Sequence, residues 1–178
     1  MRIITAPEPY IRQPKDITVF LAGGITNCWE WQDKVIEMLQ NQIEVNLDNL
    51  VVFNPRRKNF PIDKPEESRK QIKWEFEMLE QCDIFSMYFC AGESNQPICM
   101  YELGRNICRM QMKYPVDWDT RIVITTEDDY KRAKDVRIQT SLATGFCESA
   151  VNNNIKYHVD EIIDQYIWID ELEYDFLE

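Results

Sequence analysis

A long apolar run is the first feature that the sequence lacks. None of its hydrophobic stretches approaches the ~20 residues that a membrane-spanning helix needs. The opening residues, MRIITAPEPY, also lack the apolar segment of a signal peptide. We therefore expect a cytoplasmic protein that has no contact with a membrane.

Basic residues are scarce relative to acidic ones. Lys and Arg together number 20 against 31 Asp and Glu, which gives a formal net charge of −11. A surface this acidic repels a phosphate backbone, so we expect no nucleic-acid polymer as a partner. A small anionic ligand remains possible where basic residues cluster locally.

Metal-ligand patterns are sparse as well. The chain has one histidine, His158, and no CxxC pair. Its cysteines are Cys28, Cys82, Cys90, Cys99, Cys108 and Cys147. Most of them lie among apolar residues, so we interpret them as small, reduced core residues of a protein from a reducing compartment. We expect neither a metal nor an organic cofactor.

What the sequence does contain is an alternation of strand and helix patterns. Its 44% hydrophobic and 12% aromatic content argues against disorder and suits one domain over residues 1–178. The expected strands span residues 17–25, 49–55, 83–89 and 121–128, and the expected helices span residues 27–40, 68–82, 98–111, 130–145 and 154–172. This order favours an α/β fold whose parallel sheet is covered by helices on both faces.

Two details of the helices can be predicted from residue spacing. Asn27 and Glu30 have the spacing of a capping box, which places a helix start at Asn27. In the second helix, Ile72, Phe76 and Leu79 recur at helical spacing and are expected to form its apolar face.

Ligands of open α/β sheets bind beyond the carboxyl ends of the strands, near a switch in strand order. The segments AGGIT, NPRR and AGESNQPICMYELG should meet there. In the first, Gly23 and Gly24 offer backbone N–H groups without side chains, which suits an anion or a sugar hydroxyl. The alternative is a plain turn between a strand and a helix.

Two further segments supply candidate ligand contacts. Arg56 and Arg57 follow a strand, and their guanidinium groups suit a phosphate or carboxylate. Salt bridges to nearby acids are the alternative. Trp74 and Glu75 pair a ring that can stack on a base with an acid that can bind the base edge. A core Trp and a solvated Glu are the alternative.

Glu102 is the sharpest candidate. It precedes Leu103 and Gly104 at the start of a predicted helix, just after a polar loop. A carboxylate can attack an anomeric carbon because it stabilises the oxocarbenium-like transition state. Most helical Glu residues are solvent-exposed, and that is the alternative.

The ordered set FLAGGI, NPRR, QIKWEFEMLEQCDIFSMYF and ICMYELG resembles the nucleoside 2-deoxyribosyltransferase family. The resemblance covers roughly residues 17 to 128, and the order of the segments carries it. It implies a flavodoxin-like (Rossmann-like) sheet. It also implies that Glu102 attacks C1′ of a deoxynucleoside, forming a covalent intermediate that another base or water resolves.

The resemblance implies further roles. Gly23, Gly24 and Ile25 would admit the sugar, Glu75 would bind the base or serve as the acid, and Asn152 would reach the pocket of a neighbouring subunit in a homo-oligomer. A first-strand tyrosine of the family is absent, because the strand reads Val19-Phe20. Gln96 stands where the family has a second acidic residue.

We therefore expect an enzyme that cleaves the N-glycosidic bond of 2′-deoxynucleosides or their 5′-monophosphates. Glu102 and Glu75 would be catalytic, Trp74 would contact the base, and Arg56 would bind a phosphate. Two alternatives stay open: an N-glycosidase acting on NAD, and a non-catalytic nucleotide sensor with the same fold.

Overall fold

The computed structural model describes residues 1–61 and 63–175 and contains a parallel sheet of five strands. The strands are β1 (Arg2–Thr5), β2 (Ile17–Gly23), β3 (Leu50–Asn54), β4 (Ile84–Phe89) and β5 (Ile122–Thr126). Their order is β1-β3-β2-β4-β5. Strands β2 to β5 follow the flavodoxin-like order, so the predicted fold class is confirmed. The edge strand β1 was not predicted, since RIIT is too short to give a clear pattern.

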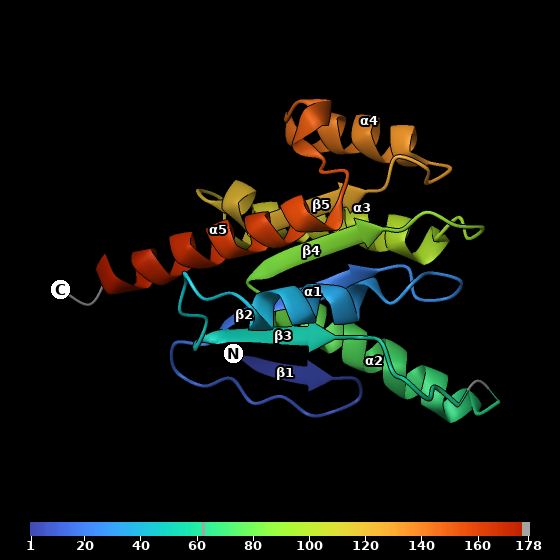
Figure 1. Cartoon of the computed structure of the whole chain (residues 1–178), viewed down its shortest axis with the longest axis horizontal. Helices are drawn as coiled ribbons and strands as arrows, with labels where there is room; N and C mark the ends of the chain where they lie inside the picture. Colours follow the sequence, from blue (N-terminus) through green and yellow to red (C-terminus); the bar gives the residue numbers. More distant parts are fainter. Residues whose placement is uncertain (62, 176–178) are drawn as a thin grey trace.

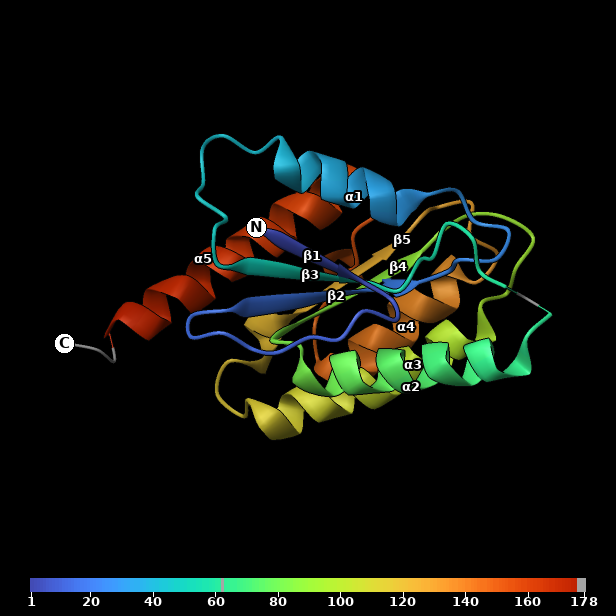
Figure 2. The same ribbon diagram turned by 90° about the horizontal axis from the view of Figure 1, so that it is seen from below.

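Helices cover both faces of this sheet (Figures 1 and 2). They are α1 (Trp31–Gln40), α2 (Pro65–Gln81), α3 (Pro97–Lys113), α4 (Ala133–Thr144) and α5 (Ile155–Asp175), with short 3₁₀ turns at Trp118–Arg121 and Glu148–Ala150. Figure 2 shows α1 and α5 on one face and α2, α3 and α4 on the other. The pairs among β2, β3, β4 and β5 are parallel, as the sequence pattern predicted, and the unpredicted β1 also pairs with β3 in parallel.

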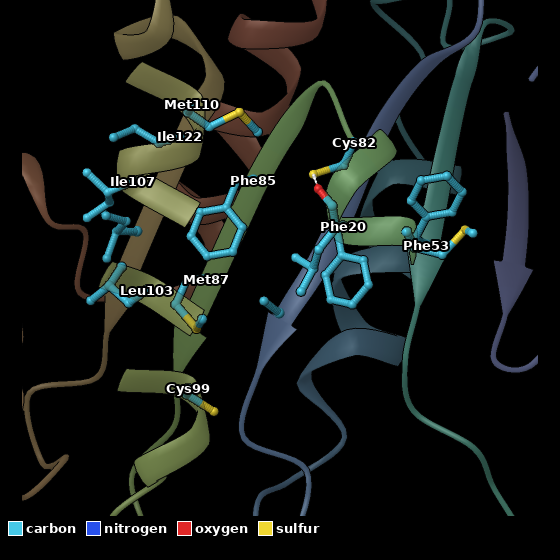
Figure 3. Packing of buried hydrophobic residues seen from close by; sticks show 14 of the residues in the cluster. Phe20, Phe53, Cys82, Phe85, Met87, Cys99, Leu103, Ile107, Met110 and Ile122 are labelled. Carbon is cyan, nitrogen blue, oxygen red and sulfur yellow. Dashed lines mark hydrogen bonds between the residues drawn. The ribbon is translucent and has the colours of Figure 1, made fainter. Parts of the chain in front are cut away.

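The alternation of side chains along β2 divides the core into two layers. Val19 and Leu21 pack on the α1 and α5 side, whereas Phe20 and Ala22 pack on the α2 and α3 side. On the second side, Leu103, Ile107 and Met110 from α3 lie against Phe85 and Met87 of β4 (Figure 3). This packing fixes α3, and with it the position of Glu102, against the sheet.

Two predicted details of the helices are wrong. Helix α1 begins at Trp31, because Asn27 has a φ of 58° in the left-handed region and no capping hydrogen bond forms at Glu30. Helix α2 turns a different face to the core: Leu79 is buried as predicted, but Ile72 is 65% exposed and Phe76 is 55% exposed. Its buried residues are Gln71, Trp74, Met78 and Leu79. Both stripes have helical spacing, so periodicity alone could not choose between them.

The expectation of six reduced core cysteines is also wrong. Cys28 and Cys90 form a disulfide. Of the free cysteines, Cys82 and Cys99 are buried, but Cys108 and Cys147 are exposed. In the described part of the chain, none of the helices has the length and apolar character that crossing a membrane requires.

The chain's histidine is buried beneath the sheet. His158 of α5 lies with Nε2 at 2.8 Å from Ser86 Oγ and Nδ1 at 2.8 Å from Thr125 Oγ1. Burial lowers the pKa of His158 from 6.5 to about 3, so the folded protein holds a neutral ring. Because this Ser–His pair is fully buried, its hydroxyl has no access to a substrate and the contacts are structural.

We predict a pH-dependent stability contribution from His158. Its pKa is lower in the folded protein than in the unfolded chain, so the contribution is present above about pH 6.5 and is lost as the pH falls towards 3. Relative to His158→Gln, the wild type should lose about 2 kcal/mol of unfolding free energy from about pH 7 to about pH 5. Urea denaturation at both pH values measures this. A difference between the two proteins that does not change with pH would contradict it.

Candidate active site

A pocket of about 270 Å³ opens at the carboxyl edge of the sheet. It lies where the strand order switches, since β3 pairs with one side of β2 and β4 with the other. The loops that follow β2, β3 and β4 gather at this edge (Figure 2). Its wall comprises Phe20, Ala22 and residues 23–26 from β2 and its loop, Pro55 after β3, Glu75 from α2, and Ser94, residues 96–99 and Glu102 from the loop after β4 and α3. The predicted meeting of three segments is therefore observed.

Gly23, Gly24 and Ile25 form one wall of this pocket. A Cβ at Gly23, whose φ is 148°, would overlap the carbonyl oxygen of Tyr88 on the neighbouring strand. A Cβ at Gly24 would overlap the Cys28 sulfur and the Gln96 side chain. Close packing within the protein therefore requires both glycines.

Glu102 projects from α3 into the pocket. Burial, together with the negative charge of Glu75, raises the pKa of Glu102 from 4.5 to about 7, and Arg105 opposes this shift only weakly. A carboxyl with this pKa is present in both its protonated and its ionised form near neutral pH. Glu102 is therefore a partly buried carboxyl with a shifted pKa in a cleft, not a solvated residue of a helix surface.

Glu75 shares the pocket with Glu102 and comes from α2. Burial raises the pKa of Glu75, and a hydrogen bond from Gln71 Nε2 to Glu75 Oε1, 2.8 Å long, opposes that rise. Cys99 lies one turn before Glu102 and also lines the pocket. Burial and the two nearby carboxylates raise the pKa of Cys99 to about 12, so its sulfur remains a neutral thiol.

Gln96 is a pocket residue that the predicted site did not include. It is 4% exposed, has a φ of 47° and immediately precedes α3. Its Nε2 donates to the carbonyl of Cys90 at 2.8 Å. Its Oε1 is buried and has no hydrogen-bond partner among the described residues. A buried acceptor beside a pocket is a group that a ligand donor can satisfy. The resemblance to the family was the one sequence signal for this position.

The structure places Arg56 outside the pocket. Its Nε donates to Gln32 Oε1 at 2.8 Å, and its Nη2 donates to the carbonyls of Ile25, Cys28 and Trp29. These carbonyls belong to the loop that follows β2, so Arg56 stabilises the backbone of that loop. Arg57 lies nearby and forms an ion pair with Glu67 at 3.0 Å.

Trp74 and Asn152 lie outside this chain's pocket as well. The Trp74 ring is buried against Phe20 and Phe53, and its Nε1 donates to the Glu8 carbonyl at 2.6 Å. Asn152 follows the 3₁₀ turn Glu148–Ala150 and lies beside β5, where its backbone N–H donates to the carbonyl of Ile124. Its side chain contacts Glu161, so a reach into a neighbouring subunit stays a prediction.

Several interactions tie the two loops that flank the pocket. The Cys28–Cys90 disulfide joins the loop after β2 to the end of β4. Glu127, just after β5, accepts hydrogen bonds from Trp29 Nε1 at 2.8 Å and from Tyr88 Oη at 2.7 Å. It also accepts one from the backbone N–H of Ala91. The pocket walls are therefore held in place without a ligand.

Phe20 of β2 lines the pocket and has no hydroxyl, so this strand contributes an apolar side chain to the wall. Tyr88 and Tyr101 lie outside the lining: Tyr88 bonds to Glu127, and Tyr101 is exposed. Among residues 1–61 and 63–175, no group of three His, Cys, Asp or Glu side chains is arranged to hold a metal ion.

Comparison with known proteins agrees with the geometry. Residues 16–123, more than half of the chain, match a family model described as "Nucleoside 2-deoxyribosyltransferase like". The match includes the glycine turn, Glu75 and Glu102. It ends within β5, so α4 and α5 lie outside it. No curated protein sequence gives a significant match.

We predict that the two carboxyls titrate as a coupled pair. Replacing Glu75 by Gln removes the charge but keeps the burial, so the pKa of Glu102 should fall from about 7 towards 4.5 without reaching it. Carbon-13 NMR of labelled glutamate carboxyls can follow the titration. The matched control is Glu77→Gln, an exposed carboxyl on the same helix. An unchanged Glu102 titration in Glu75→Gln would rule out the coupling.

Proposed function

The chain belongs to the nucleoside 2-deoxyribosyltransferase-like family, and from this premise we propose that it cleaves the N-glycosidic bond of 2′-deoxynucleosides. Glu102 is the nucleophile, and the product of the first step is a covalent deoxyribosyl–Glu102 ester. One observation carries the proposal: Glu102 and Glu75 line the same small pocket as Gly23 and Gly24, at the carboxyl edge of a parallel sheet.

In the first step, a Glu102 carboxylate oxygen bonds to C1′ of the sugar. The bond from C1′ to the base nitrogen breaks, and its electron pair leaves with the base. The base takes up a proton from the carboxyl of Glu75, and the oxocarbenium-like transition state is stabilised by the adjacent Glu102 charge. In the second step, water or another base attacks C1′, the ester bond breaks, and the attacking group returns a proton to Glu75.

This chemistry needs one ionised and one protonated carboxyl. Two carboxyls in one poorly hydrated pocket do not ionise together easily, so the pair retains a single proton over a range of pH. The pKa of Glu102, raised to about 7, and the raised pKa of Glu75 support such sharing near neutral pH. Catalysis then requires neither a metal nor an organic cofactor, because the pair supplies nucleophile and acid.

The sugar would lie beside Gly23, Gly24 and Ile25, which line one side of the pocket. The buried Gln96 Oε1 supports this placement, since it has no partner among the described residues and can accept from a sugar hydroxyl. The base then lies towards Glu75. A pocket of about 270 Å³ suits a nucleoside better than a dinucleotide, so NAD is a poorer candidate substrate.

Charge favours a nucleoside over its 5′-monophosphate. The residues that line the pocket include two carboxyls, Glu75 and Glu102, and none of them is Lys or Arg. Arg56, the expected phosphate ligand, is engaged by backbone carbonyls and Gln32. A phosphate would therefore meet like charges in a poorly hydrated site.

We further propose a homo-oligomer in the cytoplasm. Ile98 lines the pocket and is 66% exposed, and the neighbouring Tyr101 is exposed as well. A second copy that covers these side chains would bury apolar surface and exclude water from the reacting atoms. Asn152 of such a copy remains the candidate cross-subunit contact.

The proposal makes Glu102 indispensable. Glu102→Gln should lower base release from deoxynucleosides by at least about 10³-fold, because an amide cannot form the ester. Chromatography of released base measures this, and Glu77→Gln serves as the control. Incubation with a 2′-deoxy-2′-fluoro nucleoside should add the mass of the fluorosugar at Glu102. Undiminished turnover in Glu102→Gln, or a label on another residue, would refute the assignment.

The pocket charge gives a prediction about substrate choice. The 5′-monophosphate should show a kcat/KM at least about tenfold below that of the same deoxynucleoside. Arg56→Gln should reduce kcat/KM by a similar factor for both substrates, because Arg56 supports the loop after β2. Were Arg56 a phosphate ligand, this variant would lose activity on the monophosphate alone.

A further inference from the structure

Gln71 is a buried polar residue next to the pocket, and it is neither the nucleophile nor the acid of the proposed reaction. It lies on α2, one turn before Glu75, and is 9% exposed. Its Nε2 donates to the Pro55 carbonyl at 2.7 Å and to Glu75 Oε1 at 2.8 Å. Its Oε1 is buried and has no hydrogen-bond partner among the described residues.

The surroundings determine which way the Gln71 amide faces. A peptide carbonyl can only accept a hydrogen bond, so the group that faces the Pro55 oxygen must be the NH₂. This NH₂ has two hydrogens. One points to Pro55 and the other to Glu75, so Glu75 receives an N–H donor and not the amide oxygen. A hydrogen bond of this kind favours the ionised form of the carboxyl.

No other described group gives Glu75 comparable support. The titratable groups that face it are Glu102 and the Cys99 thiol, both from α3. The pocket walls from β2 and β3 present Phe20, Ala22 and Pro55, which do not titrate. Burial makes it harder for Glu75 to ionise, and the Gln71 hydrogen bond opposes this effect.

We propose that Gln71 is a positioning residue that directs the Glu75 carboxyl into the pocket and stabilises the carboxylate left when Glu75 protonates the departing base. The inference rests on the proposed function, in which Glu75 is the acid. When the C1′–N bond breaks, the electron pair goes to the base, the proton passes from Glu75 to the base nitrogen, and the new negative charge on Glu75 Oε1 lies against the Gln71 N–H.

The test compares two leaving groups. Gln71→Met keeps the length of the side chain and removes the donor. Turnover of a deoxynucleoside, whose base needs a proton, should fall by about 10- to 100-fold. Turnover of 4-nitrophenyl 2-deoxyribofuranoside should change less than about twofold, because nitrophenolate leaves without an acid. The alkaline limb of the deoxynucleoside pH profile should move to higher pH, since Glu75 then holds its proton more tightly.

Controls separate this role from folding and from the proposed function itself. Gln81→Met, on the same helix but outside the pocket lining, should behave like the wild type. If Gln71→Met does not fold, Gln71→Asn, whose amide is too short to reach both acceptors, is used instead. Equal losses on both substrates with an unmoved alkaline limb, or no loss at all, would overturn the inference. A wild type that releases no base from any deoxynucleoside would overturn the proposed function.

Discussion

The confinement of two partly buried carboxyls in one pocket is the constraint on which the rest of this structure depends. Burial disfavours the charged form of Glu102 and of Glu75, and the charge of Glu75 further raises the pKa of Glu102. A surface pair of acids would separate and hydrate. Here they cannot separate, because α2 and α3 are both packed against the same face of the sheet. The cost in free energy is therefore built into the fold, which is typical of a functional site.

Two like charges held in one pocket require rigid walls. The loop after β2 is bound to Arg56 through three of its backbone carbonyls. The same loop is joined to the end of β4 by the Cys28–Cys90 disulfide, and Glu127 accepts hydrogen bonds from both sides. These contacts come from β3, β4 and β5, so the pocket shape depends on the whole sheet edge. Such preorganisation is what electrostatic catalysis requires, since no reorganisation remains for the reaction step.

The sequence predicted the framework of this site better than its lining. Strands β2 to β5 can be recognised in the sequence as apolar, β-branched runs. The positions of their carboxyl ends then predicted where Glu102 and the two glycines come together. The lining depends on contacts that local patterns do not contain. Arg56 binds backbone carbonyls, which look the same in every sequence. Helix α2 is rotated about its axis so that Trp74, and not Ile72, faces the core. Each residue belongs to a row of side chains with helical spacing, so spacing could not decide between them. The Cys28–Cys90 pair joins residues that are far apart in the chain.

Gln71 and Gln96 explain why polar residues are the hardest part of such a site to predict. Both side chains are buried. The Gln71 NH₂ donates a hydrogen bond to the Pro55 carbonyl, and the Gln96 NH₂ donates one to the Cys90 carbonyl. Each also keeps an amide oxygen without a partner among the described residues. Gln165 of α5 is buried in the same way, with its Nε2 on the Ile122 carbonyl and its Oε1 without a partner among the described residues, yet it lies outside the pocket lining. This bonding pattern is therefore not by itself a sign of function. Gln71 and Gln96 differ from Gln165 in their position, because Gln71 bonds to the pocket residue Glu75 and Gln96 lines the pocket itself. That position follows from the packing of the folded chain, which local sequence patterns do not contain.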